Sequence, residues 1–200
     1  MNLRAPAIML AARLHGETAV IGRFLTAEHG LLAGYVAGGR GRNLRPVVIP
    51  GNLVALDLHA KSDSQLPFAK VELVESRAPW LSEPLPAAAI EWCCALTATA
   101  LLERQAYPSL YEALDGLLTA ICHAPSARGW ASALVGYETL LLRELGYGGG
   151  VRLVSEDWPT ILMAFDKLAL PLERYLLADR RGDVMAARAL LRARLGRISE

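Results

Sequence analysis

The chain has 200 residues, of which 53% are hydrophobic and 20% charged, with a formal net charge of +1, so it can bury a sizeable core in one large domain or two small ones. No apolar run is long enough to cross a bilayer, and the apolar part of the N-terminus is short and lacks a clear cleavage site, so we expect no signal peptide. The odd number of cysteines, Cys93, Cys94 and Cys122, indicates reduced thiols in a cytosolic protein.

The residue pattern in the N-terminal part of the chain predicts five short strands, each bounded by turn residues. The expected strands are 7–14, 19–26, 31–37, 52–60 and 68–76. The last two alternate clearly between apolar and polar positions, as half-buried strands do. Five strands in about eighty residues predict a small closed barrel such as the OB-fold, and an SH3-like barrel would give much the same pattern.

A loop rich in glycine and arginine separates the third and fourth expected strands. It contains Arg40, Arg42 and Arg45 within six residues, and no acidic residue occurs between Glu28 and Asp57. The glycines beside these arginines let the backbone approach a ligand closely, and arginine offers a forked donor that fits phosphate. The loop therefore predicts an anionic polymer as the ligand.

After Pro79 the apolar spacing becomes helical. Leu110, Leu114 and Leu117 fall on one helix face, and similar spacing recurs further along the chain. The expected helices are 87–105, 109–122, 127–145, 157–178 and 183–195. We therefore expect an α+β chain, with a five-stranded OB-fold β-barrel over residues 1–79 and an all-α helical domain over residues 80–200.

Motifs for bond chemistry are missing from the sequence. The cysteines lack the spacing of a zinc site, the four histidines are scattered, and no nucleophile or phosphate-loop motif occurs. The acidic residues form no evident catalytic pair. We therefore expect no catalytic residue, no metal and no cofactor, and we infer a binding protein rather than an enzyme.

Basic residues are unevenly distributed along the chain. Residues 1–50 contain six arginines and two glutamates, and the C-terminal stretch is arginine-rich again. This layout is typical of nucleic-acid binding, although ordinary solvated surface charge would also explain the C-terminal stretch. The candidate DNA-binding residues are the three loop arginines together with Arg13, Arg23, Lys61 and Lys70. Phe24 and Tyr35 are either stacking residues or part of the barrel core.

Several segments together resemble one known family, the RecO family of bacterial recombination mediators. They are HGE at 15–17, LTAEHG at 25–30, GGRGRNLRP at 38–46, PGN at 50–52, LYEAL at 110–114, LRELGYG at 142–148 and ARALL at 187–191. They occur in the family's order along nearly the whole chain. One departure is clear, because many members carry a cysteine-rich, zinc-finger-like insertion after the segment that resembles 142–148, and here the chain leads almost directly to Trp158.

The resemblance implies an OB-fold followed by a helical domain, and a function in DNA repair and recombination. It implies binding of single- and double-stranded DNA, annealing of complementary strands, and contact with RecR and with the acidic tail of the single-strand-binding protein, which together help to load RecA. It further implies a cytoplasmic, nucleoid-associated protein. Arg104, Arg128 and Arg143 are candidates for the partner contact by location alone.

Two other functions are compatible with the same sequence. The chain could be a barrel-plus-helices adaptor that binds only proteins, or a non-catalytic accessory of a DNA-processing enzyme. A DNA affinity that depends on salt would distinguish the mediator from the protein-only adaptor. A nuclease would need clustered carboxylates for metal, and the N-terminal part of the chain offers only scattered acidic residues.

Overall fold

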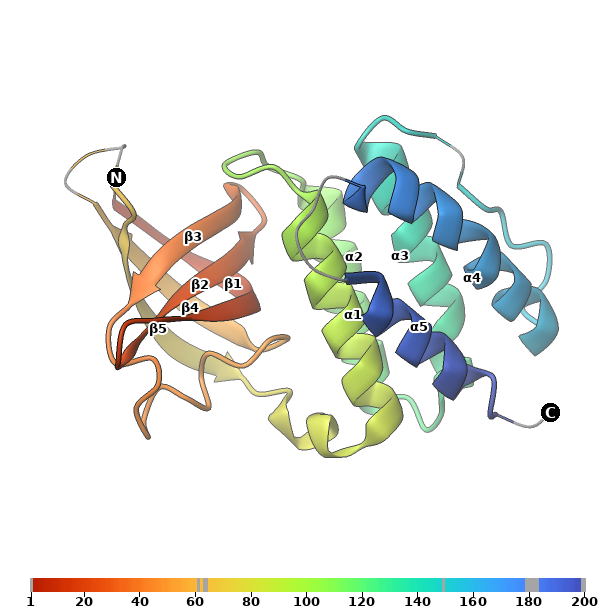
Figure 1. The fold of residues 1–200 in the computed structure, drawn as a ribbon, viewed down its shortest axis with the longest axis horizontal. Coiled ribbons are helices and arrows are strands. Elements are labelled where there is room, and N and C mark those ends of the chain that lie inside the picture. The colour runs from red at the N-terminus through yellow and green to blue at the C-terminus, as the bar shows by residue number, and fades with distance from the viewer. Residues whose placement is uncertain (1, 61, 63–64, 149, 179–183, 199–200) are drawn as a thin grey trace.

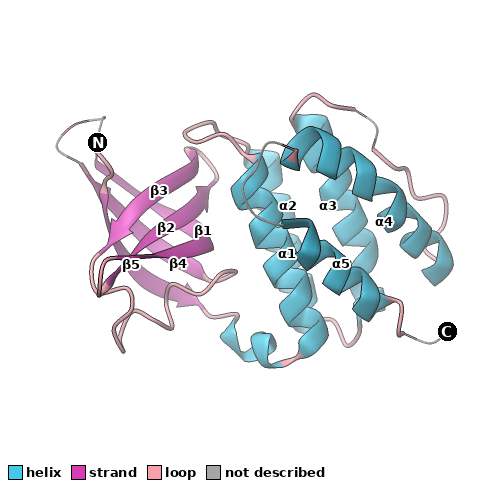
Figure 2. Ribbon diagram, in the orientation of Figure 1, coloured by secondary structure: helices cyan, strands magenta, loops and turns pink. Residues whose placement is uncertain are grey.

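The strands and helices of this chain separate into two halves (Figure 1). The structure is a computed structural model that describes residues 2–60, 62, 65–148, 150–178 and 184–198. These described residues form five strands followed by five α-helices. Figure 2 shows the strands gathered at one end of the molecule and the helices at the other. The expected α+β order is confirmed.

The strands form a closed barrel in the order β1-β2-β3-β5-β4. Their bounds are β1 (Asn2–His15), β2 (Ala19–Thr26), β3 (Gly30–Val36), β4 (Leu53–His59) and β5 (Phe68–Glu75). β3 and β5 pair in parallel through Tyr35 and Phe68, and the other neighbours are antiparallel. Closure leaves no long free edge to pair with another chain. The expected OB-like barrel is thus confirmed.

β1 is longer than the predicted strand because it serves both sides of the barrel. Its first half pairs with β4, from Asn2 opposite His59, and its second half pairs with β2, ending at His15 opposite Ala19. An irregularity between Met9 and Ala11 marks the change of partner. The first residues of β1 lack the apolar run that predicts a strand, so only the second half was expected.

The helical half begins directly after the barrel. Its elements are η1 (Ala78–Ser82), α1 (Pro84–Ala100), α2 (Pro108–His123), η2 (Ala127–Gly129), α3 (Ala131–Glu144), α4 (Trp158–Leu172), η3 (Glu173–Leu177) and α5 (Val184–Leu195). Proline stands in the first turn of α1, α2 and α4, where its missing N–H leaves no hydrogen bond unmade. The Asp157 side chain caps α4 by accepting from the Thr160 N–H at 3.0 Å.

The prediction that the first helix continues to residue 105 is wrong. α1 ends at Ala100, and the following residues run beside β3 instead. The Arg104 N–H donates to the Leu31 carbonyl at 2.9 Å, and Arg104 has a φ of 61°. This pairing with a strand uses backbone groups that a continued helix would occupy. The α1–α2 loop therefore joins the helices to the barrel.

The buried apolar side chains form two clusters, and the larger of them spans both halves of the molecule. A smaller cluster fills the inside of the barrel, around Phe24. The larger cluster lies among the helices and includes Ile8, Leu10, Leu25 and Leu31 from the barrel. Burial of each such side chain stabilises the folded state by about 1.5–3 kcal/mol. The two halves are therefore docked against each other.

A buried arginine adds a polar contact to this junction. Arg77, between β5 and η1, is 0% exposed. Its backbone N–H donates to Asn52 Oδ1 at 2.9 Å, and its Nη1 donates to the Gly51 carbonyl at 2.6 Å. Its Nη2 donates to Asp115 Oδ1 on α2 at 2.8 Å. Arg77 thus connects the end of the β3–β4 loop to the helical half.

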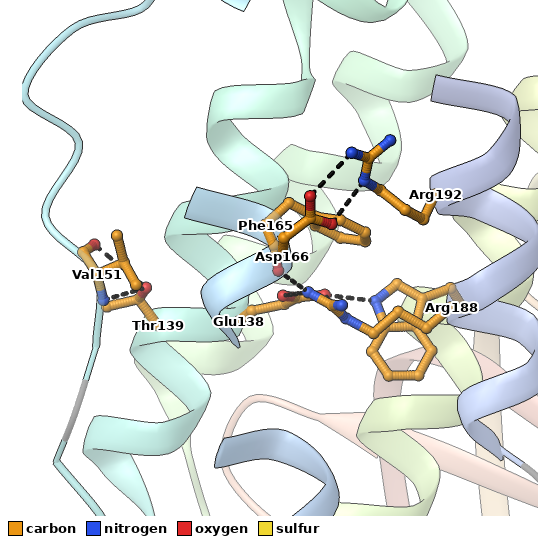
Figure 3. A network of polar contacts seen from close by, with 8 residues as sticks. Glu138, Thr139, Val151, Phe165, Asp166, Arg188 and Arg192 are labelled. Carbon is orange, nitrogen blue, oxygen red and sulfur yellow. Dashed lines mark hydrogen bonds and ion pairs between the residues drawn. The ribbon is translucent and has the colours of Figure 1, made fainter. Parts of the chain in front are cut away.

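An ion pair that is buried on both sides lies within the helical half (Figure 3). Arg188 on α5 donates from Nη2 to Glu138 Oε2 on α3 at 2.7 Å, and from Nε to Glu138 Oε1 at 3.1 Å. Trp92 Nε1 on α1 also donates to Glu138 Oε1, at 2.7 Å. The pair therefore holds α5 against α1 and α3.

Candidate nucleic-acid interface

A row of side chains crosses four strands on the outside of the barrel. Arg13 on β1 lies opposite Ile21 on β2, Ile21 lies opposite Tyr35 on β3, and Tyr35 lies opposite Phe68 on β5. Directly opposed residues share one face of a sheet, so these four side chains point outward together. The row begins with a cation, and it ends with an aromatic ring that is 64% exposed.

Three aromatic rings meet along this row. The rings of His15 and Tyr35 contact edge to face, with centroids 5.8 Å apart, and those of Tyr35 and Phe68 do the same at 5.3 Å. Phe68 also lines a depression of about 720 Å³ together with His59 and Leu66. Unpaired bases stack on exposed aromatic rings without regard to sequence. The row therefore offers a stacking surface beside a cation.

The arginine loop between β3 and β4 is anchored at several points. Val47 and Val48 are buried in the barrel core. Asn52, itself 0% exposed, donates from Nδ2 to the carbonyls of Pro46 and Val47 at 2.9 and 3.1 Å. Gly39 packs so closely against Val20 that an added Cβ would lie 2.6 Å from it. The loop is therefore less free than its glycine content suggests.

The three loop arginines differ in their surroundings. Arg40 donates from Nη1 to the carbonyls of Glu17 and Gly16, at 2.7 and 3.3 Å, and so fixes the loop to the β1–β2 turn. This turn directly follows His15, so Arg40 lies close to the aromatic row. Arg42 and Arg45 are exposed, and neither side chain forms a hydrogen bond or an ion pair with the described residues. They are available to phosphate.

The other expected DNA-binding residues lie at different places. Arg23 shares the outer face with Arg13, because it lies opposite Ala11, and its Nη2 is 3.4 Å from Glu103 Oε1. Lys70 lies on the β4–β5 side of the barrel, opposite Asp57. Its Nζ is 3.0 Å from Glu72 Oε1. Lys61 lies outside the described residues. The structure thus brings Arg13, Arg23 and Arg40 toward the end of the row at β1 and β2, and it places Lys70 at the other end, two residues from Phe68 on the outer face of β5.

Sequence reasoning missed two aromatic members of the row. Phe24 belongs to the barrel core at 0% exposure, whereas Tyr35 lies on the outer face. His15 was counted only among the scattered histidines, and Phe68 only as the start of an expected strand. The alternation of β5, in which Ala69 and Val71 are buried, would have placed Phe68 outside. Its proximity to Tyr35 depends on the β3–β5 pairing, which no local pattern reveals.

Comparison with known proteins gives the family. The family model described as Recombination protein O N terminal matches residues 1–77, and Recombination protein O C terminal matches residues 82–149. The chain belongs to the RecO family. DNA repair protein RecO of Rhodospirillum centenum is 42% identical over 143 residues, which cover 71% of this chain and 56% of that protein. DNA repair protein RecO of Phenylobacterium zucineum is 38% identical over 149 residues, or 74% of this chain and 60% of that protein.

The match covers neither the full length of this chain nor the full length of its relatives. The chain spans less than two thirds of the length of these curated RecO relatives. The family models end at residue 149, so α4 and α5 lie beyond them. Between α3 and α4 this RecO-family chain carries no cysteine. The expected resemblance to the family is confirmed over the barrel and the first three helices.

The three arginines expected at the partner contact do not form one site. Arg128 precedes α3, with its guanidinium 5.3 Å from the ring centroid of Trp158, and Arg143 lies in the last turn of α3. A helix of this length separates its ends by about 20 Å. Arg104 lies in the α1–α2 loop beside β3. A partner peptide would therefore contact some of these arginines and not all three.

The described part of the chain offers neither a metal-binding cluster nor a membrane-spanning helix. There, no group of three or more His, Cys, Asp or Glu side chains could hold a metal ion. The three cysteines are buried and free, and burial raises the pKa of the Cys94 thiol to about 12. No helix among the described residues is both long and apolar enough to span a membrane.

Proposed function

We propose that this RecO-family chain is a non-catalytic DNA repair and recombination mediator that binds single- and double-stranded DNA. The observation that supports it best is the outward row from Arg13 to Phe68, next to the arginine loop. We further propose that it anneals complementary strands and acts with RecR and the single-strand-binding protein to help load RecA. The RecR and RecA steps are supported by family membership alone.

The two parts of this surface suit the two forms of DNA differently. Arg42 and Arg45 can neutralise phosphates on either form without reading sequence. Phe68 and Tyr35 can stack only with unpaired bases, because a duplex hides the faces of its bases. A single strand would therefore use both the arginines and the rings, whereas a duplex would use the arginines.

A salt titration of DNA affinity tests the arginine part. Replacing Arg42 and Arg45 with alanine should weaken binding of every sequence, and should lower the slope of log affinity against log salt by up to about two units, since each phosphate contact contributes about 0.9 on duplex DNA. The matched control is Lys167→Ala/Arg197→Ala, which removes the same charge from exposed positions of the helical half. Equal slopes in the two double variants would refute the loop contact.

The aromatic part has its own test. Phe68→Ala should weaken single-strand binding by about 1–3 kcal/mol, the usual loss for one stacked base, and should leave duplex affinity unchanged. Strand annealing, followed with two labelled complementary oligonucleotides, should slow in the same variant. If the wild-type chain bound neither form of DNA at low salt, the protein-only adaptor would be the better function.

We also propose a position for the partner tail. A groove of about 490 Å³ lies between η1, α1 and α2 and is lined by Trp80, Leu85 and Trp130. Arg128 lies two residues before Trp130, with its guanidinium over the Trp158 ring of α4, and Arg194 on α5 donates to the Pro84 carbonyl at the groove's edge. Apolar side chains with arginines nearby fit a peptide that is both acidic and hydrophobic, whereas the Glu83 carboxylate, which also lines the groove, disfavours acidic residues directly beside it.

Calorimetric titration with the C-terminal peptide of the single-strand-binding protein would test this position. Trp80→Ala and Arg128→Ala should each lower the affinity for the peptide, whereas Arg143→Ala, at the far end of α3, should leave it unchanged. If Arg143→Ala weakened peptide binding and Trp80→Ala did not, the peptide site would lie elsewhere. A weak contact with this peptide and a weak contact with DNA, made by the same molecule, would reinforce each other through effective concentration.

A further inference from the structure

A second exposed aromatic surface lies on the helical half. Tyr147 follows α3 and Tyr175 lies in η3, and their rings stack with centroids 5.2 Å apart and planes 10° from parallel. The two residues are 48% and 43% exposed. The element η3 continues α4 past Pro171 and directs Tyr175 toward Tyr147. The fold thus brings together two rings from distant parts of the sequence and leaves them open to solvent.

The two tyrosines line a cavity of about 280 Å³. Its other lining residues include Leu102, Gln105 and Glu144. Ligand sites in proteins usually measure about 300–1,000 Å³, so this cavity suits one planar ring system rather than a larger molecule. The Gln105 amide can donate and accept, and the Glu144 carboxylate can accept, so both can bond to the polar edge of a base.

One guanidinium lies over a tyrosine ring, and another lies next to a residue that lines the cavity. The Arg174 guanidinium is 5.5 Å from the centroid of the Tyr175 ring. Arg143 Nη2 is 3.9 Å from Glu144 Oε1, and the Arg143 side chain is 71% exposed. A site that binds an unpaired nucleotide needs a ring face for the base, polar groups for the edge of the base and a guanidinium for the phosphate.

We propose that Tyr147 and Tyr175 form a second site for an unpaired base of single-stranded nucleic acid. This inference rests on the proposed function and adds a site on the helical half. The α1–α2 loop connects the two sites, because Glu103 pairs with Arg23 of the barrel while its neighbours Leu102 and Gln105 line the cavity. A strand held on the barrel therefore has a second contact on the other side of the same loop.

The test combines photocrosslinking with substitution in the full chain. A single-stranded oligonucleotide with 5-iodouracil at successive positions should crosslink to wild-type peptides that contain Tyr147 or Tyr175. The variant Tyr147→Ala/Tyr175→Ala should lose roughly 5- to 100-fold in single-strand affinity, as expected for one lost stacked base, and keep its duplex affinity. The control Met163→Ala/Leu170→Ala removes side chains on α4 that are 55% and 68% exposed, and should bind as the wild type does.

The outcomes separate this site from the barrel site. If wild-type protein binds single strands, but crosslinks and affinity losses are confined to barrel residues such as Phe68, the second site is wrong and the proposed function stands. If wild-type protein binds no DNA, both are wrong. Tyr147→Phe/Tyr175→Phe keeps both rings and should bind single strands as the wild type does, so a loss of single-strand affinity in this variant overturns the inference. The inference also falls if the alanine variant keeps its single-strand affinity and loses only the binding of a protein partner. The wild-type crosslinks decide the matter even if the alanine variant fails to fold.

Discussion

Removal of the Arg188 guanidinium should destabilise the helical half strongly. In Arg188→Met most of the apolar stem remains, whereas every hydrogen bond from Arg188 to Glu138 is lost. The Arg188 and Glu138 side chains are 4% and 0% exposed, so water cannot replace the missing donor. Among the described residues, Trp92 Nε1, at 2.7 Å, is the side-chain donor that Glu138 would keep. The Phe165 carbonyl, which also accepts from Arg188, would lose its donor as well.

The expected loss is large because a charge is left buried without its partner. Breaking such a pair from one side usually costs about 3–5 kcal/mol. For a chain of this size, this corresponds to a fall in Tm of roughly 6–20 °C, at about 2–4 °C per kcal/mol. Arg192→Met is the matched control, one turn further along α5. Arg192 and its partner Asp166 are 34% and 50% exposed, so that variant should lose less than about 1 kcal/mol.

The size of the loss should depend on pH. Burial raises the pKa of Glu138 above its usual range, and the neighbouring Arg188 guanidinium opposes that rise. Without Arg188 the pKa of Glu138 should rise further. A carboxyl group with a raised pKa in the folded state stabilises that state at low pH, and this contribution is lost as pH rises through the folded pKa. The penalty of Arg188→Met should therefore be smaller at about pH 5 than at about pH 8.

Urea unfolding followed by tryptophan fluorescence would measure these differences. The double variant Glu138→Gln/Arg188→Met should recover part of the loss, because glutamine carries no charge and still accepts from Trp92. A penalty below about 1 kcal/mol for Arg188→Met, or an equal penalty at both pH values, would refute the reasoning from the buried charge.

Other substitutions and one analysis test the junction, the backbone and the metal content. Arg77→Met should cost about 1–3 kcal/mol in the same urea assay, because the buried Gly51 carbonyl loses its donor, and a neutral result would mean that apolar packing alone holds the halves together. Gly30→Ala should lower Tm sharply, because Gly30 has a φ of +65° and an added Cβ would lie 1.7 Å from the Gln105 carbonyl oxygen. Gly116→Ala in α2, where a Cβ would meet nothing within 4 Å, should be neutral or stabilising, and equal effects at the two glycines would contradict this. Elemental analysis after a chelator wash should find no stoichiometric zinc, because the cysteines lack ligand spacing, and one retained zinc per chain would disprove it.

The sequence predicted the elements of this fold better than the contacts between them. The alternation in β4 and β5 and the leucine spacing in α2 are local patterns, so they give strands and a helix near the observed bounds. The end of α1 at Ala100 was missed, because residues 101–105 are apolar and charged in a helical pattern. What ends the helix is the pairing of that segment with Leu31 on β3, far away in the sequence.

The candidate site shows the same division. The arginine loop was recognisable because its composition is unusual. The role of Asn52 was not recognisable, since its partners Pro46 and Arg77 are defined only by the folded loop and the junction. Tyr147 follows α3 and Tyr175 lies in η3, far apart in the sequence, so no local pattern places their rings together.

The anchoring of the arginine loop changes how its affinity for DNA should arise. A freely moving glycine-rich loop would lose backbone freedom when it binds, and fixing each residue costs about 1–2 kcal/mol. Here the contact from Arg40 to Glu17 and the contacts of Asn52 already fix the backbone in the folded protein. Binding then has to order little more than the side chains of Arg42 and Arg45. Because Asn52 also contacts Arg77, the docking of the helical half contributes to this preorganisation, so the helices should support DNA binding even where they do not contact DNA.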